Sequence, residues 1–453
     1  MKVEKPLGIF TVMEKRGLTT LEIFQGRKEG DFLLRGAKEW DDDLQFSGYA
    51  TNFTYLDLLT KDYRAVGTET LASDFKEMGL EDYLERIKQL LREGKHDGIE
   101  FYYHRKRDIR VAFCKHSVTV GLGNRQHAIR AGAMRRYGMD EPEIDVLIDG
   151  LNLSRAMTYK NAIAFLPYGG CKTVVQCNPV KLDDFETMGF LSYIADRCRC
   201  FPGADMGLDE EMVDIIRERY TRNFVGGTGS PLASTGTPTA YGEFVAIKEA
   251  CDFVYGNQDL STRRIAVQGL GHVGYPLAEY LLGGGSKLIV TDVDPARVHR
   301  LQQNYGSGSV RYVAPDEIYT VDADIFSPCA IGGIITEDRI PQFKFKIIIG
   351  SANNQLKATS REGEIELAKK LADAGILFVV DWVHNNGGVV AASMLWQLQE
   401  DATEEQLKPK IELPCRTNFR ELLEKARETG KTPTELAYEK VEAMVYLGSR
   451  FGK

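Results

Sequence analysis

The sequence lacks the features that would place the protein in a membrane or on nucleic acid. No apolar run in its 453 residues approaches the roughly 18 residues that a membrane helix needs. The opening MKVEKPLGIF contains neither the apolar core nor the cleavage site of a signal peptide. Basic residues are outnumbered, with 57 lysines and arginines against 65 acidic residues and a formal net charge of −8. We therefore expect a cytoplasmic protein with no nucleic-acid or membrane partner.

Disulfide and metal motifs are also missing. The eight cysteines are spread along the chain, which is typical of reduced cytosolic thiols rather than of a disulfide framework. Only Cys198 and Cys200 lie close together, and neither a second pair nor a suitably spaced histidine accompanies them. The sequence therefore predicts no metal site.

The hydrophobic patterning predicts an α/β protein of two domains with a cleft between them. Residues 1–235 mix strands and helices. The Gly-, Ser- and Pro-rich stretch 226–238 is typical of an interdomain hinge. Residues 236–390 alternate short apolar strands with helices, which predicts a doubly wound parallel sheet. The helical tail, 391–453, is expected to pack back on the first domain.

Within the first domain, the pattern predicts individual elements. Strands are expected at 7–14, 19–26, 31–37, 99–104, 109–114, 117–123 and 173–177. Helices are expected at 80–91, 143–165, 182–198 and 209–220. A Gly-rich turn at 168–170 precedes the last of these strands.

The most specific local motif is a glycine-rich loop between two strands. Gly269 permits a tight turn, Gly271 lets a pyrophosphate approach the backbone, and Gly274 lets helix and strand pack closely. His272 and Val273 belong to the same loop, which opens a helix whose N-terminal N–H groups face the phosphates. The motif predicts a dinucleotide-binding Rossmann domain, and the alternative is a Rossmann-like domain that binds nothing.

The choice of dinucleotide depends on the end of the second strand. Asp292 can accept hydrogen bonds from the adenosine ribose hydroxyls and would repel a 2′-phosphate. We therefore expect NAD rather than NADP. Arg297 could relax that preference or could be an ordinary helix-surface residue.

Further motifs make the chain resemble a known enzyme family. They are MTYKNAIAFLPYGGCKT at 157–173, DIFSPCAIGGII at 324–335, GSANNQL at 350–356 and DWVHNNGGVV at 381–390. In this order they resemble the Glu/Leu/Phe/Val amino-acid dehydrogenases, and the leucine dehydrogenases most of all. The resemblance implies an N-terminal substrate and oligomerisation domain, an NAD domain and a homo-oligomer. The implied reaction is the reversible oxidative deamination of an L-amino acid to a 2-oxo acid and ammonia.

The resemblance also implies roles for single residues. Lys160 would pair with the substrate α-carboxylate, Lys172 would polarise the reacting carbonyl, and Asp205 would exchange a proton with the amine. Further contacts to the substrate or the cofactor are implied for Thr239, Cys329, Ala330, Asn354 and Asn385. Each residue has a plainer alternative: a lysine can be solvated, Asp205 can cap a helix, and an asparagine can bond loop backbone.

Departures from the family pattern bear on the substrate. Cys171 stands where the family has Gly or Ala, and a buried inert thiol fits there. The resemblance places Arg130 at a position that contacts the substrate side chain, so we hypothesise a polar or anionic substrate side chain. The alternative is that Arg130 is a surface residue. His384 is a further pocket candidate.

Residues 36–100 match the family least and look like an insertion. The changed pocket and this insertion motivate the first of two rival functions. One is a specialised biosynthetic enzyme acting on an unusual amino acid or 2-oxo acid. The other is a non-catalytic NAD-binding regulatory protein, against which the intact Lys160, Lys172 and Asp205 argue.

Overall fold

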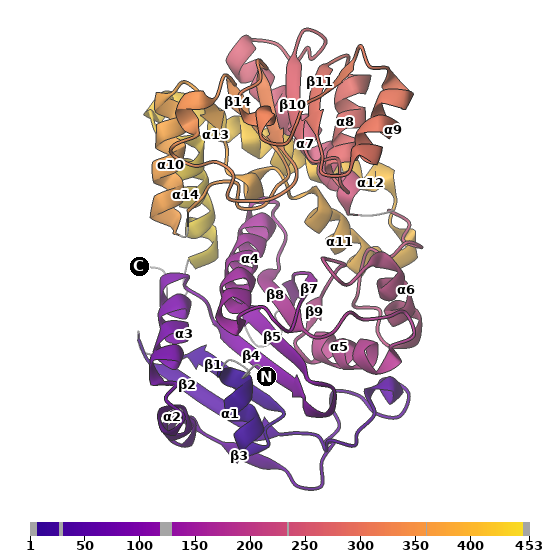
Figure 1. Ribbon diagram of the computed structural model, residues 1–453, viewed down its shortest axis with the longest axis vertical. Coiled ribbons are helices and arrows are strands. Elements are labelled where there is room, and N and C mark those ends of the chain that lie inside the picture. The colour runs from indigo at the N-terminus through magenta and orange to yellow at the C-terminus, as the bar shows by residue number, and fades with distance from the viewer. Residues whose placement is uncertain (1–6, 27–29, 118–128, 233–234, 359, 447–453) are drawn as a thin grey trace.

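The molecule is built on two β-sheets, one in each half. The computed structural model describes residues 7–26, 30–117, 129–232, 235–358 and 360–446. Figure 1 shows one sheet in the lower half and one in the upper half, with α4 (Glu143–Ile163) rising between them. No helix in the described ranges is both long enough and apolar enough to cross a membrane. The two-domain α/β fold predicted from the sequence is confirmed.

The lower sheet has nine strands in the order β3-β2-β1-β4-β5-β8-β6-β9, and β7 pairs with β8 off this path. The strands are β1 (Thr20–Gln25), β2 (Phe32–Lys38), β3 (Arg64–Val66), β4 (Gly98–His104), β5 (Ile109–Lys115), β6 (Arg130–Ala131), β7 (Met134–Tyr137), β8 (Gly169–Gln176) and β9 (Cys200–Phe201). One face packs against α1 (Ile9–Arg16), α2 (Thr68–Glu77), α3 (Glu81–Glu93) and α4. The other face packs against α5 (Phe185–Arg197) and α6 (Glu210–Arg219).

Two local predictions for this half are wrong. The strand expected at 7–14 is the helix α1, whose Ile9, Phe10, Val12 and Met13 are buried at helical spacing. The turn expected at 168–170 is shorter, because β8 already begins at Gly169. Most of the strand expected at 117–123 lies outside the described residues.

Residues 36–100 contribute to the lower half of the molecule directly. They supply the end of β2, β3, α2, α3 and the start of β4. Phe46 from this segment packs edge-on against Phe190 of α5, with ring centroids 4.8 Å apart. The segment is therefore part of the core of the first sheet; whether it is an insertion stays a prediction.

The upper sheet has six parallel strands in the order β12-β11-β10-β13-β14-β15, which is the Rossmann order 3-2-1-4-5-6. Its strands are β10 (Arg264–Gln268), β11 (Lys287–Thr291), β12 (Val310–Tyr312), β13 (Ile325–Pro328), β14 (Ile347–Ile348) and β15 (Leu377–Phe378). Its helices are α7 (Gly236–Tyr255), α8 (Gly274–Gly283), α9 (Pro295–Tyr305) and α10 (Arg361–Asp373). The strands are apolar because helices cover them on both faces.

The C-terminal tail packs on both domains. It forms α11 (Gly387–Leu398), α12 (Glu404–Glu412), α13 (Phe419–Thr429) and α14 (Pro433–Tyr446). Helices α12 and α13 contact α7, and Phe419 and Leu422 join the core of the upper sheet. Only α14 among the last three helices makes substantial contact with α4. Helix α11 packs with Ala131, Tyr168 and Phe201 of the first domain. The tail therefore packs on both domains, and the domain boundaries near 235 and 390 stay a prediction.

The close packing of residues 36–100 on α5 makes a stability prediction. A Cβ added at Gly189 of α5 would lie 2.0 Å from the carbonyl oxygen of Phe46. Because neither backbone can yield cheaply, Gly189→Ala should lower the free energy of unfolding by about 1–3 kcal/mol. Chemical denaturation at fixed protein concentration measures this value.

Gly283→Ala is the matched control, because a Cβ there meets nothing within 4 Å and alanine favours a helix by up to about 1 kcal/mol. Equal stability of the Gly189 variant and the unmodified protein would contradict the packing described.

Candidate active site

A buried ion pair lies at the edge of the lower sheet. Lys172 of β8 is 5% exposed, and its Nζ contacts Oδ2 of Asp205. Arg135 of β7 binds the same carboxylate through Nε at 3.2 Å and Nη2 at 3.3 Å. Burial alone would raise the pKa of Asp205, but Lys172 and Arg135 outweigh it and lower that pKa to about 2. Asp205 is therefore an anion held between two cations.

Local turns aim the Asp205 carboxylate at Lys172. Asp205 and Leu208 exchange backbone hydrogen bonds across a turn that contains Gly207 at φ +76°. The cap of α6 is Asp209, whose side chain accepts from the backbone N–H of Met212. The helix-cap role considered for Asp205 thus belongs to Asp209, and the Asp205 carboxylate stays available to Lys172.

Lys160 stands at the end of α4, where the two halves of the molecule meet. Its Nζ donates to Oδ1 of Asn353 at 2.8 Å, and Asn385 Nδ2 donates to the same oxygen at 3.1 Å. Burial lowers the pKa of Lys160, while the nearby Asp381 carboxylate opposes that shift. Oδ1 of Asn385 is one of the buried side-chain atoms that have no hydrogen-bond partner among the described residues. A polar ligand at this junction would satisfy that oxygen.

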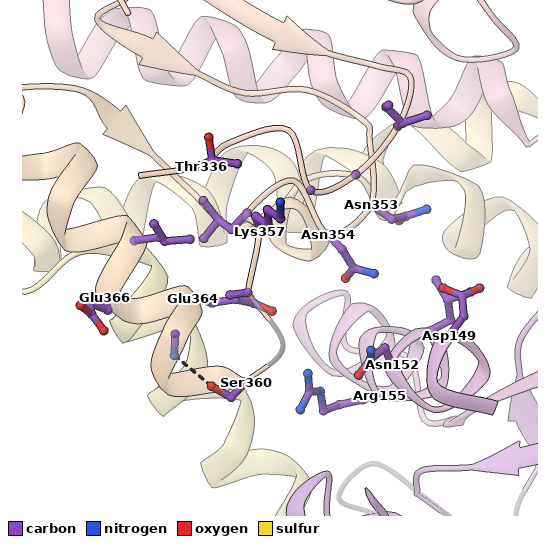
Figure 2. A pocket seen from close by; sticks show the side chains of 18 of the residues that line it. Asp149, Asn152, Arg155, Thr336, Asn353, Asn354, Lys357, Ser360, Glu364 and Glu366 are labelled. Atoms are coloured by element: carbon purple, nitrogen blue, oxygen red, sulfur yellow. Dashed lines mark hydrogen bonds between the residues drawn. The ribbon is translucent and has the colours of Figure 1, made fainter. Parts of the chain in front are cut away.

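Asn353 bonds Lys160, and the role predicted for its neighbour Asn354 at the substrate carboxylate stays a prediction. Asn354 has φ +51° and lines a cleft of about 1010 Å³ between the two halves. Figure 2 shows Asn353, Asn354 and Lys357 on a loop of the upper domain, facing α4 residues of the lower domain across this cleft. Arg135 and Met206 line the same cleft, so the Lys172–Asp205 pair lies at one end of it.

The glycine-rich loop has the geometry of a dinucleotide cradle. Gly269 has φ +91°, and a Cβ there would lie 2.8 Å from the Cβ of Ala330. A Cβ on Gly274 would lie 2.0 Å from the carbonyl oxygen of Gly269 and 3.1 Å from the Cβ of Cys329. A Cβ on Gly271 would meet only a guanidinium nitrogen of Arg297, at 3.7 Å. The loop therefore leaves open space at Gly271, where a pyrophosphate fits.

Neighbouring predicted cofactor residues support or flank this loop. Both Asp292 oxygens accept backbone hydrogen bonds, from Leu270 at 2.6 Å and Asp294 at 2.7 Å. Val273 is the N-cap of α8. His272 Nε2 lies 3.3 Å from a carboxylate oxygen of Glu210 on α6, so it contacts the lower domain. Thr239 lies in the first turns of α7 and bonds backbone there.

The two residues that depart from the family pattern, Cys171 and Arg130, contact the α5-side core. Cys171 packs in the α5-side core while Val174 packs on the α4 side, so alternation puts Lys172 on the α4 side. Arg130 Nη1 donates to the carbonyl of Cys198, in the α5-side core, at 3.3 Å. Arg130 is therefore not brought to Lys172. This arrangement does not favour an anionic side chain in the pocket.

His384 is an internal residue. It is fully buried, with Nδ1 at 2.8 Å from Glu243 Oε2 and Nε2 at 3.2 Å from the carbonyl of Val379. Both ring nitrogens are occupied, so His384 has none left for a ligand. It joins α7 to the loop that carries Asn385.

Sequence reasoning missed Arg135, Asp149 and Asn353. Arg135 Nη1 bonds Asp149 of α4 at 3.0 Å and thereby ties β7 to that helix. Alternation along β7 was the available signal, because it places Arg135 and Tyr137 on one face, and Tyr137 also bonds Asp149. No local pattern separates Asn353 from Asn354, since their roles depend on the fold of a single loop.

Comparison with known proteins agrees with this geometry. The family model for the Glu/Leu/Phe/Val dehydrogenase dimerisation domain matches residues 136–222. The Glutamate/Leucine/Phenylalanine/Valine dehydrogenase model matches residues 293–445.

Individual relatives agree as well. Leucine dehydrogenase of Thermoactinomyces intermedius is 39% identical over 289 residues, covering 62% of this chain and 73% of the relative. Phenylalanine dehydrogenase of Lysinibacillus sphaericus is 33% identical over 356 residues, covering 77% and 85%. The crystal structure of L-tryptophan dehydrogenase from Nostoc punctiforme has a TM-score of 0.63 and 30% identity, covering 79% of this chain and 98% of that one. The resemblance drawn from the motifs is confirmed.

The buried His384–Glu243 pair predicts a pH-dependent stability. Burial alone would lower the pKa of His384, but Glu243 outweighs it and raises that pKa above its ordinary value. A raised folded-state pKa gives stability that is fully present below about pH 6.5 and is lost as pH rises through the folded-state pKa. Glu243→Gln should therefore cost about 1.5–3 kcal/mol at pH 6 and less at pH 9, measured by denaturation at both pH values.

Glu405→Gln, at an exposed position on α12, is the control and should change stability little at either pH. A Glu243→Gln cost that grows with pH would contradict a protonated His384.

Proposed function

The chain belongs to the Glu/Leu/Phe/Val dehydrogenase family, and we propose that this amino-acid dehydrogenase oxidatively deaminates an L-amino acid with NAD as cofactor. The observation that carries the proposal is the buried Lys172–Asp205–Arg135 cluster at the end of the cleft that Asn353 and Asn354 line. It faces the half of the molecule that holds the dinucleotide loop. Charged groups in so sheltered a place are typical of a site where charge develops during reaction.

Each residue of the site is proposed to have its own role in the reaction. Lys160, at the junction with Asn353, binds the substrate α-carboxylate, and Asn385 offers its unpaired Oδ1 to the substrate or the cofactor. Lys172 donates to the oxygen that develops at the α-carbon when water adds and the amine leaves. Asp205, in contact with Lys172, carries the proton to and from the amine. Arg135 keeps Asp205 ionised and in place.

The upper domain is proposed to hold NAD. The residues present fit such a group, because the Gly269–Gly274 loop leaves Gly271 open and starts α8 beneath it. Asp292 lies at the end of β11, the position from which a carboxylate reads ribose hydroxyls. When bound, the nicotinamide accepts the hydride. Ala330 and Asn354 belong to the loops that follow β13 and β14, from which they would contact the nicotinamide end of the bound dinucleotide.

The substrate is proposed to have an apolar side chain. Arg130 bonds Cys198 on the α5 side of the sheet, whereas its neighbour Ala131 packs with Val389 and Val390 of α11 in one apolar cluster. This cluster lies beside Asn385, which precedes α11. Relatives named as leucine, phenylalanine and L-tryptophan dehydrogenases are consistent with such a substrate.

A homo-oligomer is proposed as the working form. The support is the match of residues 136–222 to a dimerisation domain. These residues include α4, β8 and α5, the elements around Lys172. Assembly through them would rigidify the lower half of the site.

Removing the Lys172 ammonium tests the reaction directly. Lys172→Ala should lower kcat for NAD-dependent oxidation of L-leucine by about 10²–10⁴-fold, since it deletes a charge that stabilises the reacting oxygen. The affinity for NADH, measured by fluorescence titration, should stay within about twofold because Lys172 lies in the other domain.

Lys181→Ala, an exposed lysine in the segment that follows β8, is the control and should keep full activity. Undiminished kcat in the Lys172 variant would contradict the assignment.

A substrate panel tests the pocket. L-Leucine and L-phenylalanine should give kcat/KM at least about tenfold above L-glutamate, because an unpaired carboxylate is costly to bury among apolar side chains. Arg130→Met should leave this ratio within about twofold. A preference for glutamate that disappears in the Arg130 variant would sink the apolar assignment and restore the role predicted for Arg130 from sequence.

A further inference from the structure

A buried carboxylate lies beside the residues that hold Lys160. Asp381 begins the short helix η6 (Asp381–Val383), which follows β15 and packs against α4, and it is 2% exposed. Its backbone carbonyl accepts hydrogen bonds from the N–H groups of His384 at 3.1 Å and Asn385 at 2.9 Å. These bonds engage only the backbone of Asp381. Its side chain is costly to bury unless donors or cations compensate for the carboxylate.

The Asp381 side chain is linked to Lys160 through two amide groups. Asn385 Nδ2 donates to Asp381 Oδ2 at 3.4 Å and to Asn353 Oδ1 at 3.1 Å. Asn353 Oδ1 also accepts from Lys160 Nζ at 2.8 Å. The chain of hydrogen bonds therefore runs from a carboxylate of the upper half to an ammonium on α4 of the lower half.

Asp381 also fixes the direction in which the Asn385 amide points. The amide nitrogen faces Asp381 Oδ2 at 3.4 Å and the carbonyl oxygen of Ser351 at 3.3 Å. An ionised carboxylate and a backbone carbonyl only accept hydrogen bonds, so turning the amide over would place its oxygen against two acceptors. The orientation that remains leaves the partnerless Asn385 Oδ1 as an acceptor for a ligand.

The charge of Asp381 acts on Lys160 as well. Burial lowers the pKa of Lys160, and the nearby ammonium of Lys172 also lowers it. Three carboxylates oppose this shift, in decreasing order Asp381, Glu243 and Asp205. Lys160 needs its positive charge to pair with a substrate carboxylate. The carboxylate that most favours the charged form of Lys160 is therefore important for substrate binding.

Lys160 in turn favours the ionised form of Asp381. Burial raises the pKa of Asp381, whereas Lys160, His384 and the backbone N–H of Asn354 act against that rise. Asn354 follows Asn353 on the loop that meets Lys160 and has φ +51°. The carboxylate and the ammonium thus stabilise each other's charge across the junction between the two halves.

We propose that Asp381 is a positioning residue for the substrate, which holds the Asn385 amide and the Asn353–Lys160 contact in the geometry that binds the α-carboxylate. This inference rests on the proposed dehydrogenase function. Asp381 acts through its neighbours, because Asn385 lies between its carboxylate and the ligand. Its negative charge also keeps Lys160 in the ammonium form that the α-carboxylate requires.

The affinity for a 2-oxo acid at two pH values tests this role. The probe is 4-methyl-2-oxopentanoate, which has no amine and stays a carboxylate at pH 7 and pH 10. Its binding is followed by the fluorescence of NADH, without ammonia so that no turnover occurs. Asp381→Asn keeps the side-chain shape and removes the charge, so Lys160 should lose its proton at a lower pH. Relative to the unmodified protein, the variant should lose at least about tenfold more affinity at pH 10 than at pH 7.

Three further variants separate the charge of Asp381 from its packing. Asp373→Asn, at an exposed position that ends α10, is the matched control and should change affinity by less than about twofold at either pH. In a Lys160→Arg background the guanidinium stays charged, so Asp381→Asn should cost the same factor at both pH values. Asp381→Glu keeps the charge and should retain the pH profile of the unmodified protein, which also covers a failure of Asp381→Asn to fold.

The outcomes separate the role of Asp381 from the function on which it rests. An affinity loss in Asp381→Asn that is equal at the two pH values, or no loss at all, would overturn the positioning role. So would an affinity of Asp381→Glu that falls more steeply with pH than that of the unmodified protein. Failure of the unmodified protein to bind the 2-oxo acid or to oxidise any amino acid would instead overturn the proposed function.

Discussion

The site depends on a carboxylate buried between two cations. Asp205 contacts Lys172 and is bonded by Arg135, which in turn binds Asp149. Taking such charges out of water is costly unless each is paired, so the cluster persists only while all its members are held in position. Strand β8 supplies Lys172, β7 supplies Arg135 and α4 supplies Asp149. The lower sheet and α4 therefore hold these side chains in position and shield them from water.

Helix α4 connects this charged cluster to the upper domain. It packs so tightly on β8 that a Cβ on Gly170 would lie 2.2 Å from the backbone nitrogen of Thr158. At its far end Lys160 bonds Asn353, and Asn385 bonds the same amide oxygen. One helix thus joins the Lys172 cluster to the loops of the parallel sheet. A non-catalytic protein has no need of a carboxylate buried between Lys172 and Arg135 beside such a cleft, which weighs against a regulatory role.

Much of this architecture could be predicted from sequence because its signals are local. The apolar strands, the glycine spacing at 269–274 and the long pattern of α4 depend on residues near one another in the chain. The features that could not be predicted lack such a local signal. Helix α1 was misjudged because a short apolar run does not distinguish strand from helix. No local pattern predicts the contacts of Arg130, His384 and Asn353, because their partners, Cys198, Glu243 and Lys160, are distant in sequence.

In the proposed reaction, a charged cluster holds the amino acid and a parallel sheet holds the dinucleotide. The most direct test follows the α-hydrogen itself. L-Leucine deuterated at its α-carbon should pass that deuterium to the reduced nicotinamide, where mass spectrometry detects one added deuterium per molecule formed. Release of the deuterium to water, with unlabelled reduced nicotinamide, would contradict direct transfer across the cleft and with it the proposed arrangement of the site.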